Sequence, residues 1–155
     1  MLKEAYASFF SMVKEALGYL GEVESRAELH EKTYRLFRGK YEVASQLIIE
    51  ATSYAWSARK TINGEISKCV VRFDKRLFSF KETKRGNPVL SLRLSRERIG
   101  LPISQDGAYR RLRQHLKEGW KMTSIIMKQN LSFLTVLSKT MPKPTIRPVS
   151  YTHLR

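Results

Sequence analysis

The sequence is short of the residues on which many enzymes and small stapled proteins depend. It has one cysteine, Cys69, so neither an internal disulfide nor a cysteine-based structural zinc site can form. Its three histidines are scattered, it has no glycine-rich phosphate loop, and no acidic residue follows Glu118. Metal-dependent cleavage needs carboxylates that converge on the ions. We therefore expect no metal, no cofactor and no catalytic activity in this chain.

Long apolar runs are also absent. No stretch approaches eighteen consecutive apolar residues, and the sequence does not open with the charged, apolar and small-residue pattern of a secretory leader. We expect an intracellular, cytoplasmic protein with no membrane partner and no small-molecule substrate.

The charge is strongly positive and unevenly placed. The chain has 29 Lys and Arg against 14 Asp and Glu, a net charge of +15. Residues 1–62 are almost balanced, whereas residues 63–155 carry 20 basic and six acidic side chains. Such a field attracts polyanions and makes their binding dependent on salt. Nucleic acid is the expected partner, and the alternative is a basic protein whose charges serve only solubility.

Residues 1–63 have the apolar period of helices. A first helix is expected to reach about Gly21, and Ser25 and Glu28 have the spacing of a capping box that begins a second. The second has Leu29, Thr33, Leu36 and Phe37 on its apolar face, with Gly39 ending it in a left-handed conformation. A third runs from Val43 to Ile62 and is closed by Asn63-Gly64.

After Gly64 the apolar period changes to that of strands. We expect hairpins of 69–73 with 77–80, of 90–94 with 99–103, and of 122–127 with 131–137, plus a short helix over 109–116. Pro102 restricts its strand to an edge or a bulge. The predicted fold is α+β: a three-helix recognition-type bundle over 1–63, then a small, basic, mostly antiparallel β-barrel-like sheet with one short helix over 64–140. Residues 141–155 are expected to be a proline-containing linker and a tail.

Basic side chains cluster around the expected hairpins and the short helix. Arginine can hold two phosphate oxygens or stack on a base, and Phe78, Tyr109 and Trp120 could offer stacking faces or simply pack in the core. The candidate nucleic-acid-binding residues are Tyr34, Arg35, Arg38, Lys40, Gln46, Arg72, Lys75, Arg76, Lys84, Arg85, Arg93, Arg96, Arg98, Arg110, Arg111, Arg113, Lys117, Trp120 and Lys121.

Four segments resemble one known family. They are Leu29 to Tyr41 with Ser45-Gln46-Leu47 and Ala51, Val71 to Phe80, Val89 to Leu94, and Leu116 to Ser124 with Phe133 to Val136 and Pro142. In this order and spacing they resemble the recognition and wedge portions of TnpB (OrfB-type) proteins. The resemblance covers residues 1 to about 144.

The resemblance implies a prokaryotic insertion-sequence protein, once described as a transposase, in which a guide RNA directs cleavage of double-stranded DNA. The chain departs from that pattern in lacking the opening wedge strand and the nuclease that follows, and it has Gln129-Asn130 where Asp-Gly is common. Residues 149–155 resemble a translated sequencing adapter. We therefore expect a nucleic-acid-binding fragment, with guide RNA and target DNA as partners and no nuclease of its own.

Two other interpretations stay open. The chain could be a helix-turn-helix DNA-binding adaptor in which the second and third helices read a groove and the basic sheet forms a dimer. It could also be inactive because its barrel is incomplete. The sequence does not fix the oligomeric state.

The clustered charges lead to a first prediction. Replacing Arg110, Arg111 and Arg113 by alanine weakens nucleic-acid binding far more than replacing Glu22 and Glu24, because only the arginines can contact phosphates. Fluorescence anisotropy with a labelled RNA measures the difference. Equal effects of the two sets would contradict the prediction.

Overall fold

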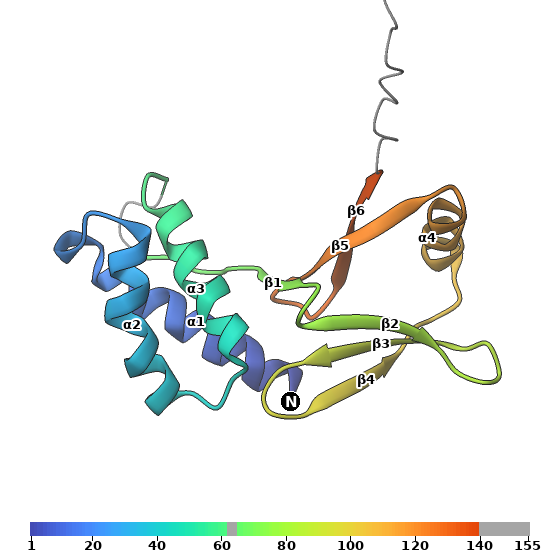
Figure 1. The fold of residues 1–155 in the computed structure, drawn as a ribbon, viewed down its shortest axis with the longest axis horizontal. Coiled ribbons are helices and arrows are strands. Elements are labelled where there is room, and N and C mark those ends of the chain that lie inside the picture. Colours follow the sequence, from blue (N-terminus) through green and yellow to red (C-terminus); the bar gives the residue numbers. More distant parts are fainter. Residues whose placement is uncertain (62–64, 140–155) are drawn as a thin grey trace, which may run out of the picture.

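The computed structural model describes residues 1–61 and 65–139, and within them the fold is α+β, as predicted. Figure 1 shows α1, α2 and α3 gathered at one end and the strands, with α4, at the other. The helical part consists of α1 (Leu2–Gly18), the short 3-10 helix η1 (Leu20–Glu22), α2 (Arg26–Lys40) and α3 (Ser45–Ala58). The strand part consists of β1 (Val71–Asp74), β2 (Phe78–Glu82), β3 (Pro88–Arg93), β4 (Arg98–Pro102), α4 (Gly107–Lys117), β5 (Trp120–Met127) and β6 (Phe133–Lys139).

The helices form because their apolar residues recur at helical spacing and can be buried together. In α3 the buried stripe is Leu47, Ile48, Ala51, Thr52 and Ala55, and α3 packs against α1, α2 and β1. The hydroxyl of Thr52 donates to its own helix, to the carbonyl of Ile48 at 3.0 Å, so no unsatisfied polar group enters this core. As a result, α3 is the central helix of the bundle.

The predicted start of α2 is confirmed, but its predicted end is wrong. The hydroxyl of Ser25 accepts from the N–H of Glu28 at 3.2 Å, and the Glu28 carboxylate accepts from the N–H of Glu24 at 2.9 Å. The helix continues through Gly39 to Lys40, and Gly39 is not among the residues with positive φ. A glycine permits the left-handed conformation but does not impose it.

Two further helical predictions also need correction. The apolar period predicts Leu36 on the buried face of α2, yet Leu36 is 42% exposed, whereas Leu29, Thr33 and Phe37 are buried. The third helix ends at Ala58 and not near Ile62. The predicted closing pair Asn63-Gly64 lies outside the described residues.

The strands form two three-stranded antiparallel sheets and not one barrel. One sheet has the order β1-β5-β6 and the other the order β2-β3-β4. The predicted hairpins β3–β4 and β5–β6 are confirmed, as are α4 and the edge position of the strand that contains Pro102.

The predicted hairpin between β1 and β2 is wrong, because the chain changes sheets at that point. Phe73 of β1 lies opposite Ile125 of β5, and Phe78 of β2 lies opposite Leu92 of β3. Between β1 and β2 the N–H of Leu77 donates to the carbonyl of Asp74 at 2.9 Å. Residues 74–77 are therefore a corner between two sheets, which we call the sheet corner. Strand alternation alone does not reveal which strand is the partner.

One hydrophobic core joins the helices to the strands. Its members run from Phe9 and Leu47 in the helices to Phe73, Leu92 and Ile125 in the strands. Polar contacts connect the same two parts: the Tyr6 hydroxyl donates to the carbonyl of Cys69 at 2.8 Å and accepts from its N–H at 3.1 Å. The helical part and the strand part therefore hold fixed positions relative to each other.

None of the helices in the described part of the chain combines the length and the apolar character needed to cross a lipid bilayer.

The Tyr6 contact gives the second prediction. Tyr6→Phe keeps the ring but leaves the N–H and carbonyl of Cys69 without their partner, so the free energy of unfolding should fall by about 1–3 kcal/mol. Urea denaturation measures this change. Tyr34→Phe is the matched control. It also removes one tyrosine hydroxyl, from a half-buried residue of α2, and should change stability less.

Candidate nucleic-acid interface

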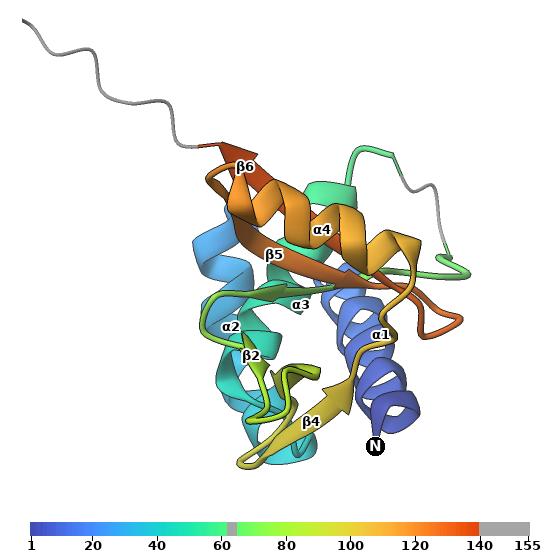
Figure 2. The same cartoon turned by 90° about the vertical axis from the view of Figure 1, so that its right-hand side faces the viewer.

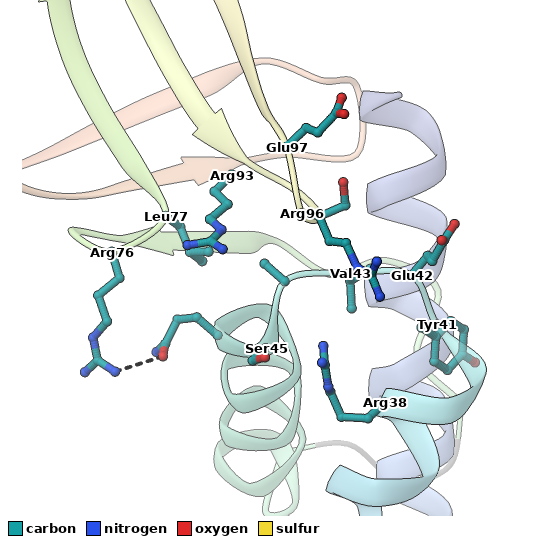
Figure 3. Close-up of a pocket in the computed structure, with 13 residues that line it drawn as sticks. Arg38, Tyr41, Glu42, Val43, Ser45, Arg76, Leu77, Arg93, Arg96 and Glu97 are labelled. Atoms are coloured by element: carbon teal, nitrogen blue, oxygen red, sulfur yellow. Dashed lines mark hydrogen bonds between the residues drawn. The ribbon is translucent and has the colours of Figure 1, made fainter.

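A cleft of about 630 Å³ opens where the helical part meets the β3–β4 turn. Its walls come from the end of α2, the α2–α3 loop, the first turn of α3, the sheet corner and the β3–β4 turn (Figure 3). The two sides are joined beneath it, because the N–H of Ala44 donates to the carbonyl of Leu94 at 2.9 Å. Val43, Leu77 and Leu94 are buried around this contact. This contact and the buried apolar side chains around it hold the two sides of the cleft together, and we call this cleft the arginine cleft.

Four arginines line the arginine cleft: Arg38 of α2, Arg76 of the sheet corner, Arg93 of β3 and Arg96 of the β3–β4 turn. In Figure 3 the side chains of Arg38 and Arg96 point toward one another, while Glu97 points away from them. Two glutamates lie in the lining, yet within the described residues no ion pair includes Arg38, Arg93 or Arg96. Arg76 pairs with the carboxylate of Asp74 at 3.7 Å, so three of the four cleft arginines keep their charge outside any ion pair of the described residues.

Arg76 is the best-positioned of the four. Its guanidinium donates to the side-chain oxygen of Gln46 on α3 at 2.9 Å, and its backbone N–H donates to Asp74 at 2.9 Å. The Arg98 guanidinium donates to the Arg76 carbonyl at 3.3 Å. Contacts from α3, β1 and β4 thus fix the sheet corner, while the Arg76 side chain stays 75% exposed to a ligand.

The first turn of α3 adds to the positive field of the cleft. Ser45 and Gln46 line the cleft, and Ala44 at the N-cap position makes no side-chain cap hydrogen bond. The first N–H groups of a helix have no partner within the helix, and the helix dipole favours negative charge at this end. An anion in the cleft would therefore face both guanidinium and backbone N–H donors.

Glu50, one turn further along α3, is a half-buried carboxylate near the cleft. Burial raises the pKa of Glu50 above its usual value, and the charge of Asp74 acts in the same direction. The nearby Arg72 and Arg26 and a hydrogen bond with Gln46 lower this pKa but do not offset the burial. Ionisation of Glu50 is therefore less favourable in the folded protein than in the unfolded chain.

The structure brings five of the predicted binding residues together and leaves the others apart. Arg38, Gln46, Arg76, Arg93 and Arg96 share the arginine cleft, and Arg98 contacts it through the carbonyl of Arg76. The other predicted residues lie outside its lining, and they are Tyr34, Arg35, Lys40, Arg72, Lys75, Lys84, Arg85, Arg110, Arg111, Arg113, Lys117, Trp120 and Lys121.

Several of these residues have distinct surroundings. Lys84 and Arg85 lie in the β2–β3 turn, at the opposite end of β3 from Arg93. Lys40 pairs with the carboxylate of Glu15, so its charge is partly neutralised. Tyr34 is half-buried and packs against His30, with 5.0 Å between the ring centroids.

The basic residues of α4 form a second group. Asp106 caps this helix by accepting from the N–H groups of Ala108 and Tyr109 at 3.0 and 3.1 Å. The helix lies across β5 (Figure 2) and buries only Tyr109. Its exposed basic side chains are Arg110, Arg111, Arg113 and Lys117. We call them the α4 basic face.

The aromatic residues suggested as stacking faces are mostly core residues. Phe78 and Tyr109 are 8% and 5% exposed, so their rings are not available to a base. Trp120 is half-buried and packs edge-on against His115, with 5.8 Å between the ring centroids. Of the three, Trp120 alone retains an accessible portion.

The prediction from sequence missed residues that the structure places in or near the cleft. Tyr41, Glu42, Ser95 and Glu97 line it, and no sequence pattern singles them out. Glu50 did carry a signal, because it is the only charged residue in α3. A lone charge in an otherwise apolar helix indicates either a partner or a shifted pKa.

No protein-family model and no curated protein matches this chain. Among the described residues, no group of three or more His, Cys, Asp and Glu side chains is arranged to hold a metal ion.

The buried carboxylate gives the third prediction. Because the folded-state pKa of Glu50 is raised, its contribution to stability is present at low pH and is lost as pH rises through that pKa. Glu50→Gln should therefore be more stable than the parent at pH 7, and the difference should vanish below the usual glutamate pKa of about 4.3. Urea denaturation between about pH 3 and pH 8 measures it. Glu31→Gln, at an exposed site on α2, is the matched control for losing one negative charge.

Proposed function

We propose that this chain binds nucleic acid, and that the arginine cleft grips the sugar-phosphate backbone. The observation that carries the proposal is the convergence of Arg38, Arg76, Arg93 and Arg96 on one cleft. They come from three separate parts of the chain, namely α2, the sheet corner and the end of β3 with the turn after it, so solubility alone does not account for their convergence.

The chemistry of the cleft suits phosphodiesters. A guanidinium presents donors in a planar fork that matches two phosphate oxygens, and such charge-assisted hydrogen bonds are among the stronger ones in proteins. Backbone phosphates carry no base identity, so these contacts position the nucleic acid without reading its sequence. The cleft would bind the nucleic-acid backbone without sequence preference, with an affinity that depends on salt.

The resemblance to TnpB proteins supplies the more specific form of the proposal. We assign the helical part to guide-RNA and target-DNA recognition and the strand part to a wedge role, as part of an RNA-guided DNA endonuclease of an insertion sequence. In this arrangement base pairing with the guide selects the target, and the protein holds the duplex by its backbone. We assign binding and not cleavage to residues 1–144.

The α4 basic face extends the same surface chemistry. Its four basic side chains are exposed, and they belong to none of the elements that line the arginine cleft. Two separate basic sites let one polyanion be held at two points, which raises the effective affinity of each contact.

The helix-turn-helix alternative finds less support in the burial of α3. A recognition helix must present exposed side chains to a DNA groove. In α3, however, Ser57 is the single fully exposed residue of the range Ser45–Ala58, and the helix is enclosed by α1, α2 and β1. An enclosed helix cannot enter a groove without unpacking the core.

The fourth prediction concerns the arginine cleft. In the full chain, the pair Arg93→Ala and Arg96→Ala should lower affinity for the guide RNA and reduce the slope of log K against log salt by about 0.7–0.9 for each phosphate that is no longer neutralised. Anisotropy over a salt series measures both quantities. Arg59→Ala is the matched control, since this exposed arginine stacks on Trp56 with 4.0 Å to the ring centroid and lies outside the cleft.

Three results would count against the proposal. One is an affinity of the parent chain that does not change with salt. Another is an equal fall in affinity in the Arg59 control. The third concerns the guide: equal affinity for an unrelated RNA would leave backbone binding in place but remove the assignment to a guide-dependent nuclease.

A further inference from the structure

A second pocket, also of about 630 Å³, lies on another part of the molecule. It is formed by Tyr54 on the second half of α3, by residues 68–70 before β1, and by the β5–β6 turn at residues 128–130. Figure 2 shows this turn beside the segment that leads into β1. None of its lining residues belongs to the arginine cleft.

The inner wall of the second pocket is rigid. The ring of Tyr54 packs edge-on against Phe9, with 6.4 Å between the ring centroids, and burial raises the pKa of its hydroxyl. Cys69 is 3% exposed, and its backbone is held on both sides by the hydroxyl of Tyr6. Val70 completes the wall as one of the exposed large apolar residues of the described chain. The pocket therefore presents an aromatic ring and apolar atoms to a ligand without rearrangement of the protein.

The polar rim is equally well fixed. In the β5–β6 turn the N–H of Lys128 donates to the carbonyl of Ser132 at 2.9 Å. The side-chain oxygen of Asn130 accepts from the N–H of Ser132 at 3.1 Å and from its hydroxyl at 2.6 Å. Because this oxygen is occupied within the turn, Asn130 has its amide NH₂ left to donate to a ligand. Gln129, the preceding residue, also lines the pocket.

The charges around the pocket are of one sign. Lys68 and Lys128 are exposed lysines on opposite sides of it, and no acidic residue is among the lining residues. A ligand that suits this pocket has a flat, partly apolar body, acceptor atoms on its edge, and negative charge attached to it.

We infer that the second pocket binds one unpaired nucleotide of a nucleic-acid strand. The base lies against the Tyr54 ring and Val70, its edge accepts hydrogen bonds from Asn130 and Gln129, and the flanking phosphates contact Lys68 and Lys128. A base in a duplex is stacked on both faces and paired along one edge, so only an unpaired base can enter. The inference rests on the proposed function, because it adds a site for a single strand to a chain that holds a nucleic-acid backbone in the arginine cleft.

The two sites differ in what they can hold. The arginine cleft offers guanidinium groups, and the aromatic residue in its lining, Tyr41, packs edge-on against Phe37. The second pocket offers a ring, amides and point charges. Stacking on an aromatic ring is tolerant of base identity, so this site favours single strands over duplexes and discriminates weakly among bases.

The experiment compares three labelled probes on the full chain: a ten-nucleotide oligouridine, the same length with central abasic sites, and a blunt hairpin duplex. An oligothymidine arm distinguishes RNA from DNA as the source of the nucleotide. For the parent chain we expect the abasic probe to bind about tenfold more weakly than the intact single strand, the effect of removing one stacked base.

Two kinds of variant locate the effect. Asn130→Asp preserves the acceptor used within the turn but replaces the free donors by a carboxylate, so it should reduce the difference between the intact and abasic probes. Lys68→Ala and Lys128→Ala should each reduce the salt slope for the single strand by about 0.7. Lys3→Ala, which removes an exposed lysine of α1, is the matched control and should change neither quantity.

A cross-link gives an independent readout that does not depend on stability. A 4-thiouridine in the oligouridine should cross-link to Tyr54 or to residues 128–130, as mapped by mass spectrometry. Cross-links confined to other segments would overturn the inference, as would an abasic probe that binds as well as the intact one. Loss of hairpin binding in the Arg93 and Arg96 variant tests the proposed function separately. An arginine-dependent hairpin with no base effect leaves that function standing and removes only the second pocket.

Discussion

The hydrogen bond from Ala44 to Leu94 is the constraint on which the arrangement of the protein depends. It joins the loop between two helices to the end of β3, above a core shared by both parts. It adds to that core a direct backbone contact at the cleft itself, between the side that carries Arg38 and the side that carries Arg93. The bond is buried among apolar side chains, so water cannot easily replace it and the cost of breaking it is high.

The distribution of charge follows from that rigid framework. Like charges at short range repel, and the arginines of the cleft are brought close by a fold whose stability comes from elsewhere. The apolar residues that support them, such as Phe73, Leu77 and Leu92, are fully buried. Because the guanidinium groups stay exposed to water and salt, their repulsion is screened.

Local signals were sufficient for much of the fold, since they arise from neighbouring residues. The change of apolar period near Gly64, the cap at Ser25 and the turns of two hairpins are all of this kind. The sequence does not reveal which strand pairs with β1. Val71 and Phe73 need an apolar strand opposite them, and the sequence contains several apolar strands besides β5. The residues of the site are also hard to predict from sequence proximity. Lys84 and Arg85 lie closer to Arg93 along the chain than Arg38 does. Of these three residues, however, Arg38 alone lines the same cleft as Arg93. The sequence shows where basic side chains cluster along the chain. It does not show which of these segments the fold brings into one cleft.

The sheet corner has a thermodynamic consequence. Its Arg76 contacts Gln46 of α3 through the side chain and Arg98 of β4 through the carbonyl, while β1 enters the corner and β2 leaves it. A ligand that binds Arg76 therefore stabilises contacts that connect α3 with both sheets. A ligand that binds only the native state shifts the unfolding equilibrium toward the native state. The thermal stability of the protein therefore increases with the occupancy of the cleft. The melting temperature of the whole chain should thus report, through mass action, how full the cleft is.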